Sequence, residues 1–155
     1  MYHSSRHLGL DYGSKRIGIA LSDPLNIIAS SFGVIPNSER SVEQIMNYVS
    51  EFEVSVIVVG MPLNLKGQKG QKAREVEEFI SRLRAQTSAE IVEWDERFTS
   101  TRVHQTLRQL GVKKKKRQSK EAIDEMAAAL ILQSYLDSSK HRLTLAQKES
   151  PDELR

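Results

Sequence analysis

The chain has 155 residues, a formal net charge of +3 and no cysteine. This length suits one domain with a hydrophobic core, and the lack of cysteine excludes disulfide bonds and Cys-ligated zinc. Residues 1–7 lack the apolar segment of a signal peptide, and the longest apolar run, residues 54–59, is far shorter than the ~20 residues of a membrane span. We therefore expect a soluble, cytoplasmic protein with no membrane partner.

The first predicted element is a β-hairpin near the start of the chain. Two apolar runs, residues 8–12 and 17–22, flank a polar loop that contains Gly13. Strand alternation gives one face of the hairpin only small residues and a single carboxylate, namely Gly9, Asp11, Gly18 and Ala20. A bare face lets another element approach closely, and a carboxylate at its edge can meet a metal or a phosphate. The alternative is an Asp that caps its own turn.

Further strands and a helix follow the hairpin. Residues 27–35 have the pattern of a third strand, which completes an antiparallel meander. Ser41-Val42-Glu43-Gln44 fits a capping box, so we expect Ser41 to cap an amphipathic helix. Residues 54–59 form a β-branched run typical of a strand covered on both faces. The order strand, helix, strand predicts a parallel crossover.

The second half of the chain alternates helices with one more strand. We predict a loop over 60–67, a helix beyond it, a strand over 90–94, a helix over 99–110, a basic loop over 111–118 and a last helix over 119–136. The apolar stripe of the first of these helices is Ala73, Val76, Phe79, Ile80 and Leu83.

These elements predict one α/β domain over residues 1–136, with a polar, flexible tail over 137–155. Its mixed five-stranded sheet combines the antiparallel three-strand meander with two parallel crossover strands, and helices flank it.

Three carboxylates are predicted to meet at one edge of this sheet. Asp11 ends the first strand, residues 60–67 follow the fourth and Glu96 follows the fifth, and the carboxyl ends of these strands should lie at the ligand-binding edge. Asp124 shares a helical face with small and apolar residues of the last helix, among them Ala127, Ala128 and Ile131. Small residues on this helix and on the hairpin permit close packing, which would bring Asp124 towards Asp11. The alternatives are a surface Asp-Glu-Arg turn and an Asp that favours a helix N-terminus.

The residue types in this cluster indicate metal-dependent chemistry. Carboxylates without cysteine or an obvious histidine select hard cations, Mg²⁺ or Mn²⁺, which activate water in phosphodiester cleavage. A dense run of cations precedes the last helix at Lys113, Lys114, Lys115, Lys116 and Arg117. This run indicates a polyanionic partner, although a solvated loop is the alternative. The combination predicts a nuclease.

Four blocks of the sequence, taken together and in order, carry a family resemblance. They are residues 8–13 with 17–20, residues 60–64 with Gly67, residues 95–101, and Ile123-Asp124 with residues 127–128 and 131–132. With these blocks the chain resembles the YqgF/RuvX family, whose members are described as pre-16S rRNA nucleases. The family is related to the Holliday-junction resolvases of ribonuclease H-like fold. The resemblance spans residues 8–132, nearly the whole predicted domain.

The resemblance implies a fold, a reaction and a set of site residues. It implies a ribonuclease H-like domain that takes part in 5′-end maturation of precursor 16S ribosomal RNA, with ribosomal particles as further partners. The family's catalytic, metal-binding acids fall on Asp11, Glu96 and Asp124. Substrate contacts are expected at Asn64, Arg97, Lys113, Lys114, Lys115 and Lys116. Glu121 matches a fourth acid of related junction resolvases, and its participation stays open.

Other functions compete with this interpretation. A Holliday-junction DNA resolvase would use the same acids, and a non-catalytic RNA-binding ribosome assembly factor would keep the fold without the reaction. An ATPase of the sugar-kinase or actin type also begins with Asp-x-Gly after a strand, but it needs two such domains, and 155 residues supply one. The sequence leaves open the choice between RNA and DNA junction, the cleavage site, the number and identity of the metals, and the oligomeric state.

Overall fold

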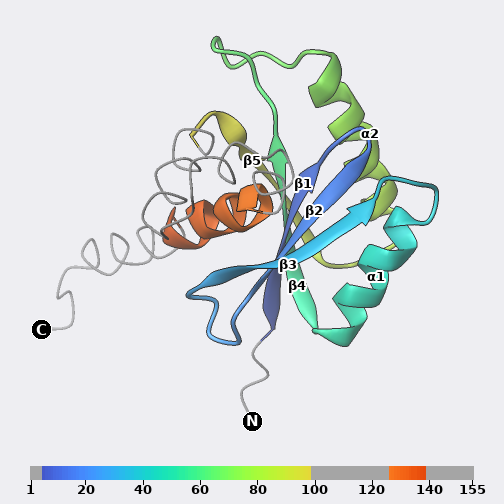
Figure 1. Cartoon of the computed structure of the whole chain (residues 1–155), viewed down its shortest axis with the longest axis vertical. Coiled ribbons are helices and arrows are strands. Elements are labelled where there is room, and N and C mark those ends of the chain that lie inside the picture. The colour runs from blue at the N-terminus through green and yellow to red at the C-terminus, as the bar shows by residue number, and fades with distance from the viewer. Residues whose placement is uncertain (1–4, 99–125, 139–155) are drawn as a thin grey trace, which may run out of the picture.

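The structure is a computed structural model that describes residues 5–98 and 126–138. Its centre is one five-stranded sheet with the strand order β3-β2-β1-β4-β5 (Figure 1). The elements are β1 (Arg6–Tyr12), β2 (Arg16–Ser22), β3 (Ala29–Pro36), α1 (Ser41–Glu51), β4 (Val54–Met61), α2 (Gln71–Arg84), β5 (Glu90–Asp95) and the 3-10 turn η1 (Glu96–Phe98). A further helix covers residues 126–138 and is called helix 126–138 below.

The sheet joins an antiparallel half to a parallel half, as the sequence predicts. β1 pairs antiparallel with β2, and β2 pairs antiparallel with β3. β4 lies parallel to β1 on the other side, and β5 lies parallel to β4. The carboxyl ends of β1, β4 and β5 therefore lie at the same edge of the sheet.

Most of the predicted elements are confirmed within a few residues. The last helix extends through residue 138, two residues beyond its expected end. The predicted helix over 99–110, the basic loop over 111–118 and residues 139–155 of the expected tail lie outside the described residues.

The predicted capping box at the start of α1 is wrong. Arg40 takes the N-cap position, and no side chain caps the helix. Ser41 is buried at the first helical position instead, where its hydroxyl donates to the Pro36 carbonyl over 2.9 Å. The same hydroxyl accepts from the Ser38 N–H over 2.8 Å. Ser41 therefore fastens the end of β3 to the helix, a role that depends on the path of the preceding turn.

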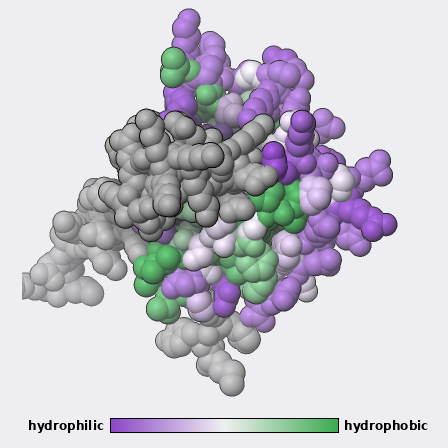
Figure 2. Space-filling model, in the orientation of Figure 1, coloured by the Kyte–Doolittle hydropathy of each residue, from purple (hydrophilic) through white to green (hydrophobic). Residues whose placement is uncertain are grey.

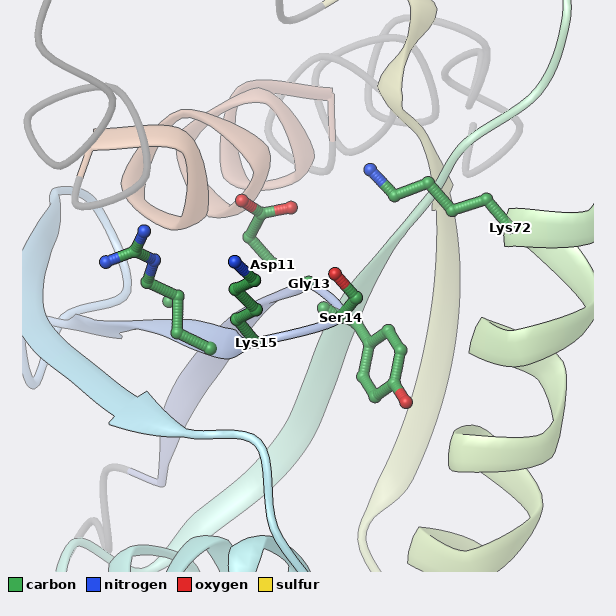
Figure 3. A pocket seen from close by; sticks show the side chains of 8 residues that line it. Asp11, Gly13, Ser14, Lys15 and Lys72 are labelled. Atoms are coloured by element: carbon green, nitrogen blue, oxygen red, sulfur yellow. The ribbon is translucent and has the colours of Figure 1, made fainter.

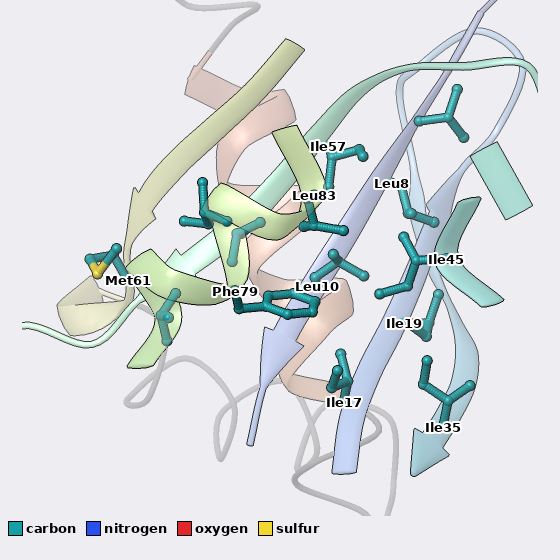
Figure 4. Packing of buried hydrophobic residues seen from close by; sticks show 14 of the residues in the cluster. Leu8, Leu10, Ile17, Ile19, Ile35, Ile45, Ile57, Met61, Phe79 and Leu83 are labelled. Carbon is teal, nitrogen blue, oxygen red and sulfur yellow. The ribbon is translucent and has the colours of Figure 1, made fainter. Parts of the chain in front are cut away.

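One face of the sheet packs against α1 and α2 (Figure 4). Leu8 and Leu10 of β1 and Ile57 of β4 point to this side, together with the apolar residues of β2. The stripe predicted for α2 is buried in full, comprising Ala73, Val76, Phe79, Ile80 and Leu83. Each large side chain buried in this way contributes about 1.5–3 kcal/mol. The molecule's outer surface on the α1 and α2 side is mainly hydrophilic (Figure 2).

The opposite face of the sheet packs against helix 126–138. Here Ala20, Val56 and Val58 contact a helix stripe that comprises Ala128, Ala129, Ile131, Leu132 and Leu136. A Cβ on Gly9 would lie 2.7 Å from the Leu132 Cβ and 2.9 Å from the Ala128 carbonyl oxygen. The close approach of small residues expected from the hairpin is therefore present.

Polar contacts also hold helix 126–138 to the strands at the two edges of the sheet, β3 and β5. The Gln133 side chain accepts from the Ala29 N–H over 2.8 Å and donates to the Ile27 carbonyl over 3.1 Å. At the β5 edge the Trp94 indole N–H donates to the Ser134 hydroxyl over 3.1 Å. The helix is thus fixed to β3 and to β5, the strand that precedes η1.

Gly9→Ala is expected to destabilise the protein by about 1–2 kcal/mol, because overpacking a filled interface outweighs the gain in strand propensity. Urea unfolding measures this loss. The added methyl group should also push helix 126–138 away from the sheet. Trp94, the chain's one tryptophan, contacts Ser134 of that helix, so its fluorescence should shift as well.

Gly70→Ala is the matched control, because no heavy atom lies within 4 Å of a Cβ at that position. It should leave the Trp94 emission unchanged and lose less stability, since only an N-cap preference for Gly is given up. Equal stability and equal emission for both variants would contradict the close approach at Gly9.

None of the helices in the described ranges combines the length and the apolarity that crossing a bilayer requires.

Candidate active site

Asp11 lies near the end of β1, beside a hairpin loop that is held by hydrogen bonds. Its Cα pairs with that of Gly18, so no side chain on β2 covers it. The Gly13 N–H donates to the Arg16 carbonyl over 2.9 Å. Asn37, just beyond β3, donates from its side chain to the Gly13 carbonyl over 2.7 Å and from its backbone to the Lys15 carbonyl over 2.9 Å. The loop therefore holds a defined position next to the Asp11 carboxylate.

Glu96 is the first residue of η1 and follows β5 directly. Its side chain lies over Gly60 of β4, the partner of Trp94 in the parallel ladder. A Cβ on Gly60 would collide with the Glu96 carboxylate and would lie 2.6 Å from the Ile131 Cδ1. Gly60 thus leaves the space in which the carboxylate fits between the sheet and helix 126–138.

Asp11 and Glu96 interact directly at the carboxyl edge of the sheet. Burial, followed by the negative charge of Asp11, raises the pKa of the Glu96 carboxyl to about 7. A hydrogen bond to Asp11 acts in the same direction, whereas the positive charge of Lys72 opposes the rise. Two carboxyl groups this close share a proton near neutral pH, or they need a cation in its place.

A cleft of about 170 Å³ opens beside Asp11 (Figure 3). Its walls come from the β1–β2 hairpin and from the first turn of α2, which contributes Lys72. Figure 3 shows the Asp11 carboxylate rising towards helix 126–138, with Lys15 on one side of it and Lys72 reaching in from the other. The cleft therefore combines an acid with cations from two separate elements.

Arg97 pairs with Asp95, the last residue of β5. Its backbone N–H donates to one Asp95 carboxylate oxygen over 2.9 Å, and its guanidinium donates to the other over 2.8 and 2.6 Å. This pairing holds the pKa of the Asp95 carboxyl below its usual value. The guanidinium also lies against Gly67, where a Cβ would be 3.3 Å from Nη1. Arg97 thus braces the loop between β4 and α2.

Asn64 organises the same loop. Its side-chain oxygen accepts from the Lys66 and Gln68 N–H groups over 2.9 and 2.8 Å, and its carbonyl accepts from the Gly67 N–H over 2.9 Å. Gly67 has φ of +77°, a conformation that glycine adopts without strain. The Asn64 side chain is therefore engaged within the loop, and its expected contact with substrate stays a prediction.

The remaining predicted site residues lie outside the described residues. They are Asp124, Glu121 and the run Lys113, Lys114, Lys115 and Lys116. Within residues 5–98 and 126–138, no group of three His, Cys, Asp or Glu side chains comes together. Asp11 and Glu96 alone are brought together, and the third predicted acid stays a prediction.

The donor set nevertheless fits a divalent cation. Both groups are carboxylates, the oxygen ligands that Mg²⁺ and Mn²⁺ prefer. Burial, followed by repulsion from Asp11, raises the Glu96 pKa, and a cation held by these residues would relieve that repulsion.

Sequence reasoning missed Lys72 as part of the site, and it placed the segment 60–67 at the ligand-binding edge without assigning Gly60 a role there. Lys72 lies 61 positions from Asp11 in the sequence, and nothing in its local pattern separates it from other surface lysines. For Gly60, the signal was its place at the end of a buried, β-branched strand, where a glycine indicates close approach of another group.

Two solved structures share this fold with the chain at low sequence identity. The Thermus thermophilus RuvC structure matches with a TM-score of 0.56 at 12% identity, covering 88% of this chain and 96% of that chain. The fowlpox virus Holliday junction resolvase matches with a TM-score of 0.50 at 10% identity, covering 86% and 99%. The fold is therefore of the ribonuclease H-like class that the RuvC-like resolvases share.

The sequence model of the family described as "RuvX: Holliday junction resolvase" matches residues 5–138, and the chain belongs to that family. A Sulfurihydrogenibium protein named "Putative pre-16S rRNA nuclease" is 44% identical over 135 residues, covering 86% of this chain and 90% of that protein. A Chloroflexus aggregans protein of the same name is 43% identical over 136 residues, covering 86% and 94%. The resemblance noted in the sequence is confirmed.

Proposed function

We propose that the protein is a metal-dependent endonuclease that matures the 5′ end of precursor 16S ribosomal RNA in the cytoplasm. The observation that carries the proposal is the contact between Asp11 and Glu96 at the carboxyl edge of the parallel strands. Two half-buried carboxylates that repel each other destabilise a fold unless a cation or a shared proton compensates them. Relatives above 40% identity that carry the name of a pre-16S rRNA nuclease favour RNA over a DNA junction.

Each acid has a defined task in this proposal. Asp11, held beside the hairpin loop, and Glu96, held over Gly60, would bind Mg²⁺ or Mn²⁺. Such ions, when bound, activate water and stabilise the leaving oxygen in phosphodiester cleavage. Asp124 is proposed as the third ligand, because it precedes Ala128 by four positions, and helical spacing puts such residues on one face. Ala128 itself faces the sheet beside Gly9.

Charged and polar residues around the acids are proposed to hold the RNA. The run Lys113 to Lys116 would attract the phosphate backbone through long-range electrostatics. Arg97 would act together with Asn64 on the loop that both residues brace. Residues 1–136 would form the nuclease domain, and residues 137–155 would be an accessory polar tail.

A substrate comparison tests the proposal. The purified protein is incubated with a precursor 16S RNA fragment, the matching mature fragment and a four-way DNA junction, each with Mg²⁺, with Mn²⁺ or with EDTA. We expect cleavage of the precursor fragment alone, in the presence of either metal and not in EDTA.

Two other outcomes would replace the proposal. Preferential, paired cutting of the junction would make the protein a resolvase, which requires a symmetric dimer in solution. Tight binding of the precursor without cleavage under any metal condition would make it a non-catalytic assembly factor.

A further inference from the structure

Two lysines from different elements flank Asp11 in the cleft. Lys15 belongs to the loop between β1 and β2, and Lys72 belongs to the first turn of α2. Both side chains are exposed and line the same cleft as Asp11 (Figure 3). Lys72 is close enough to the acid pair for its charge to act on Glu96.

The surroundings of the two lysines distinguish them from other cations nearby. Lys69, also next to the start of α2, forms an ion pair with Glu77 at 2.5 Å, and Arg97 is paired with Asp95. Among the residues that the structure describes, neither Lys15 nor Lys72 forms an ion pair. Both positive charges line the cleft that holds Asp11, and the charge of Lys72 also acts on Glu96.

The backbone under each lysine is held in place. Asn37 fixes the Gly13 and Lys15 carbonyls, so the hairpin loop keeps its position beside Asp11. The start of α2 is held by the Lys69–Glu77 pair and by the bridge between Leu63 and Lys69. The two cations thus extend towards the cleft from two separate elements, the hairpin loop and the start of α2.

From this arrangement we infer that Lys15 and Lys72 bind backbone phosphates on either side of the scissile phosphate and position the strand over Asp11. The inference rests on the proposed nuclease function and adds to it the path of the substrate. A second depression, lined by Lys15, Arg16, Val34, Ile35 and Pro36, adjoins the hairpin loop on the β3 side. The strand therefore runs from α2 across Asp11 and leaves over Lys15 towards the end of β3.

Contacts between the lysines and flanking phosphates should affect the binding of the substrate and not the chemical step. A lysine that binds a flanking phosphate holds it equally in the bound substrate and in the transition state. Its loss therefore raises KM and leaves kcat nearly unchanged. Each lost phosphate contact also makes the dependence of log K on log salt concentration less steep, by about 0.7 for single strands.

The test compares Lys15→Gln and Lys72→Gln with the parent and with Arg84→Gln. Arg84 lies in the last turn of α2, about 18 Å from Lys72 along the helix axis, so its substitution removes one charge without touching the cleft. Binding of a short fluorescein-labelled single-stranded RNA is measured by anisotropy in EDTA over a KCl titration. Cleavage of the precursor fragment gives KM and kcat.

We expect the slope of log K against log salt concentration to be about 0.7 less steep for each lysine variant than for the parent. Each lysine variant should also have a higher KM and the thermal stability of the parent. Arg84→Gln should keep the slope of the parent. Lysine variants with the parent slope and KM would overturn the inference while leaving the nuclease proposal intact. A fall in kcat without weaker binding would also overturn it. A parent that binds RNA without cutting would refute the proposed function, but the slopes would still test the phosphate contacts. A parent that binds no nucleic acid would refute both.

Discussion

Replacing Asp11 by Asn should reduce phosphodiester cleavage by more than about 100-fold. Losing a group that merely supports a metal ligand typically costs 10–100-fold, and a direct ligand should cost more. The amide keeps the size of the carboxylate but lacks the charge that a divalent cation requires. Melting temperatures with and without Mg²⁺ provide a second readout, because a bound ion at 100 times its Kd stabilises a protein by about 2.7 kcal/mol. The parent should gain this stability, and the variant should not.

Asp137→Asn is the matched control for this substitution. Asp137 is exposed on helix 126–138, and its side-chain oxygen accepts a hydrogen bond from Gln133 over 2.9 Å, which an amide oxygen can also do. The control should cut RNA and respond to Mg²⁺ as the parent does. Asp124→Asn, made in parallel, should behave like Asp11→Asn if Asp124 is the third ligand. An Asp11→Asn protein that still cuts would remove the acid pair from the reaction.

Glu96→Gln should stabilise the metal-free protein above pH 7, by an amount on the order of 2 kcal/mol. In the folded parent, burial and the Asp11 charge raise the Glu96 pKa from 4.5 to about 7. The folded state therefore binds this proton more tightly than the unfolded state does. As the pH rises from about 4.5 through 7, deprotonation opposes folding, and the parent loses stability across that window. Glutamine carries no charge at any pH and does not incur this loss.

The measurement is urea unfolding in EDTA at pH 5 and pH 8. Parent and Glu96→Gln should differ little at the lower pH and clearly at the higher one. Glu93→Gln, an exposed position on β5, is the control and should keep the pH dependence of the parent. Adding Mg²⁺ at pH 8 should restore the parent and leave Glu96→Gln unchanged. A parent whose stability is flat between the two pH values would rule out a destabilising charge on Glu96.

The parts of the fold that follow from side-chain periodicity could be predicted from the sequence. The small face of the hairpin at Gly9 and Ala20 indicated where helix 126–138 would pack, and the apolar stripe of α2 indicated its buried side. Both depend on regular spacing within one element, which the sequence displays directly. The position of Glu96 beside Asp11 followed from the rule that parallel strands end at the same edge.

Features that depend on the path of a turn or loop could not be predicted in the same way. Ser41 fits a capping motif, yet its hydroxyl bonds to the Pro36 carbonyl because of how the turn after β3 folds back. The expected contact of Arg97 with substrate stays a prediction, whereas the bonds from its guanidinium to the Asp95 carboxylate depend on how the chain turns after β5. Lys72 lines the cleft because the loop between β4 and α2 places the start of α2 beside Asp11. The residues around Lys72 carry no sequence pattern that indicates this position.

The hydrogen bonds between Gln133 and residues 27 and 29 span 106 and 104 positions of sequence. A chain made from its N-terminus builds β1, β2 and β4 long before helix 126–138 exists. Until that helix is synthesised, Ala20, Val56 and Val58 lack the contacts that they make with it. Closing such a long loop is slow compared with forming local contacts. The order of synthesis thus delays completion of this half of the core, so a nascent chain carries Asp11 and Glu96 before the layer that encloses them is in place.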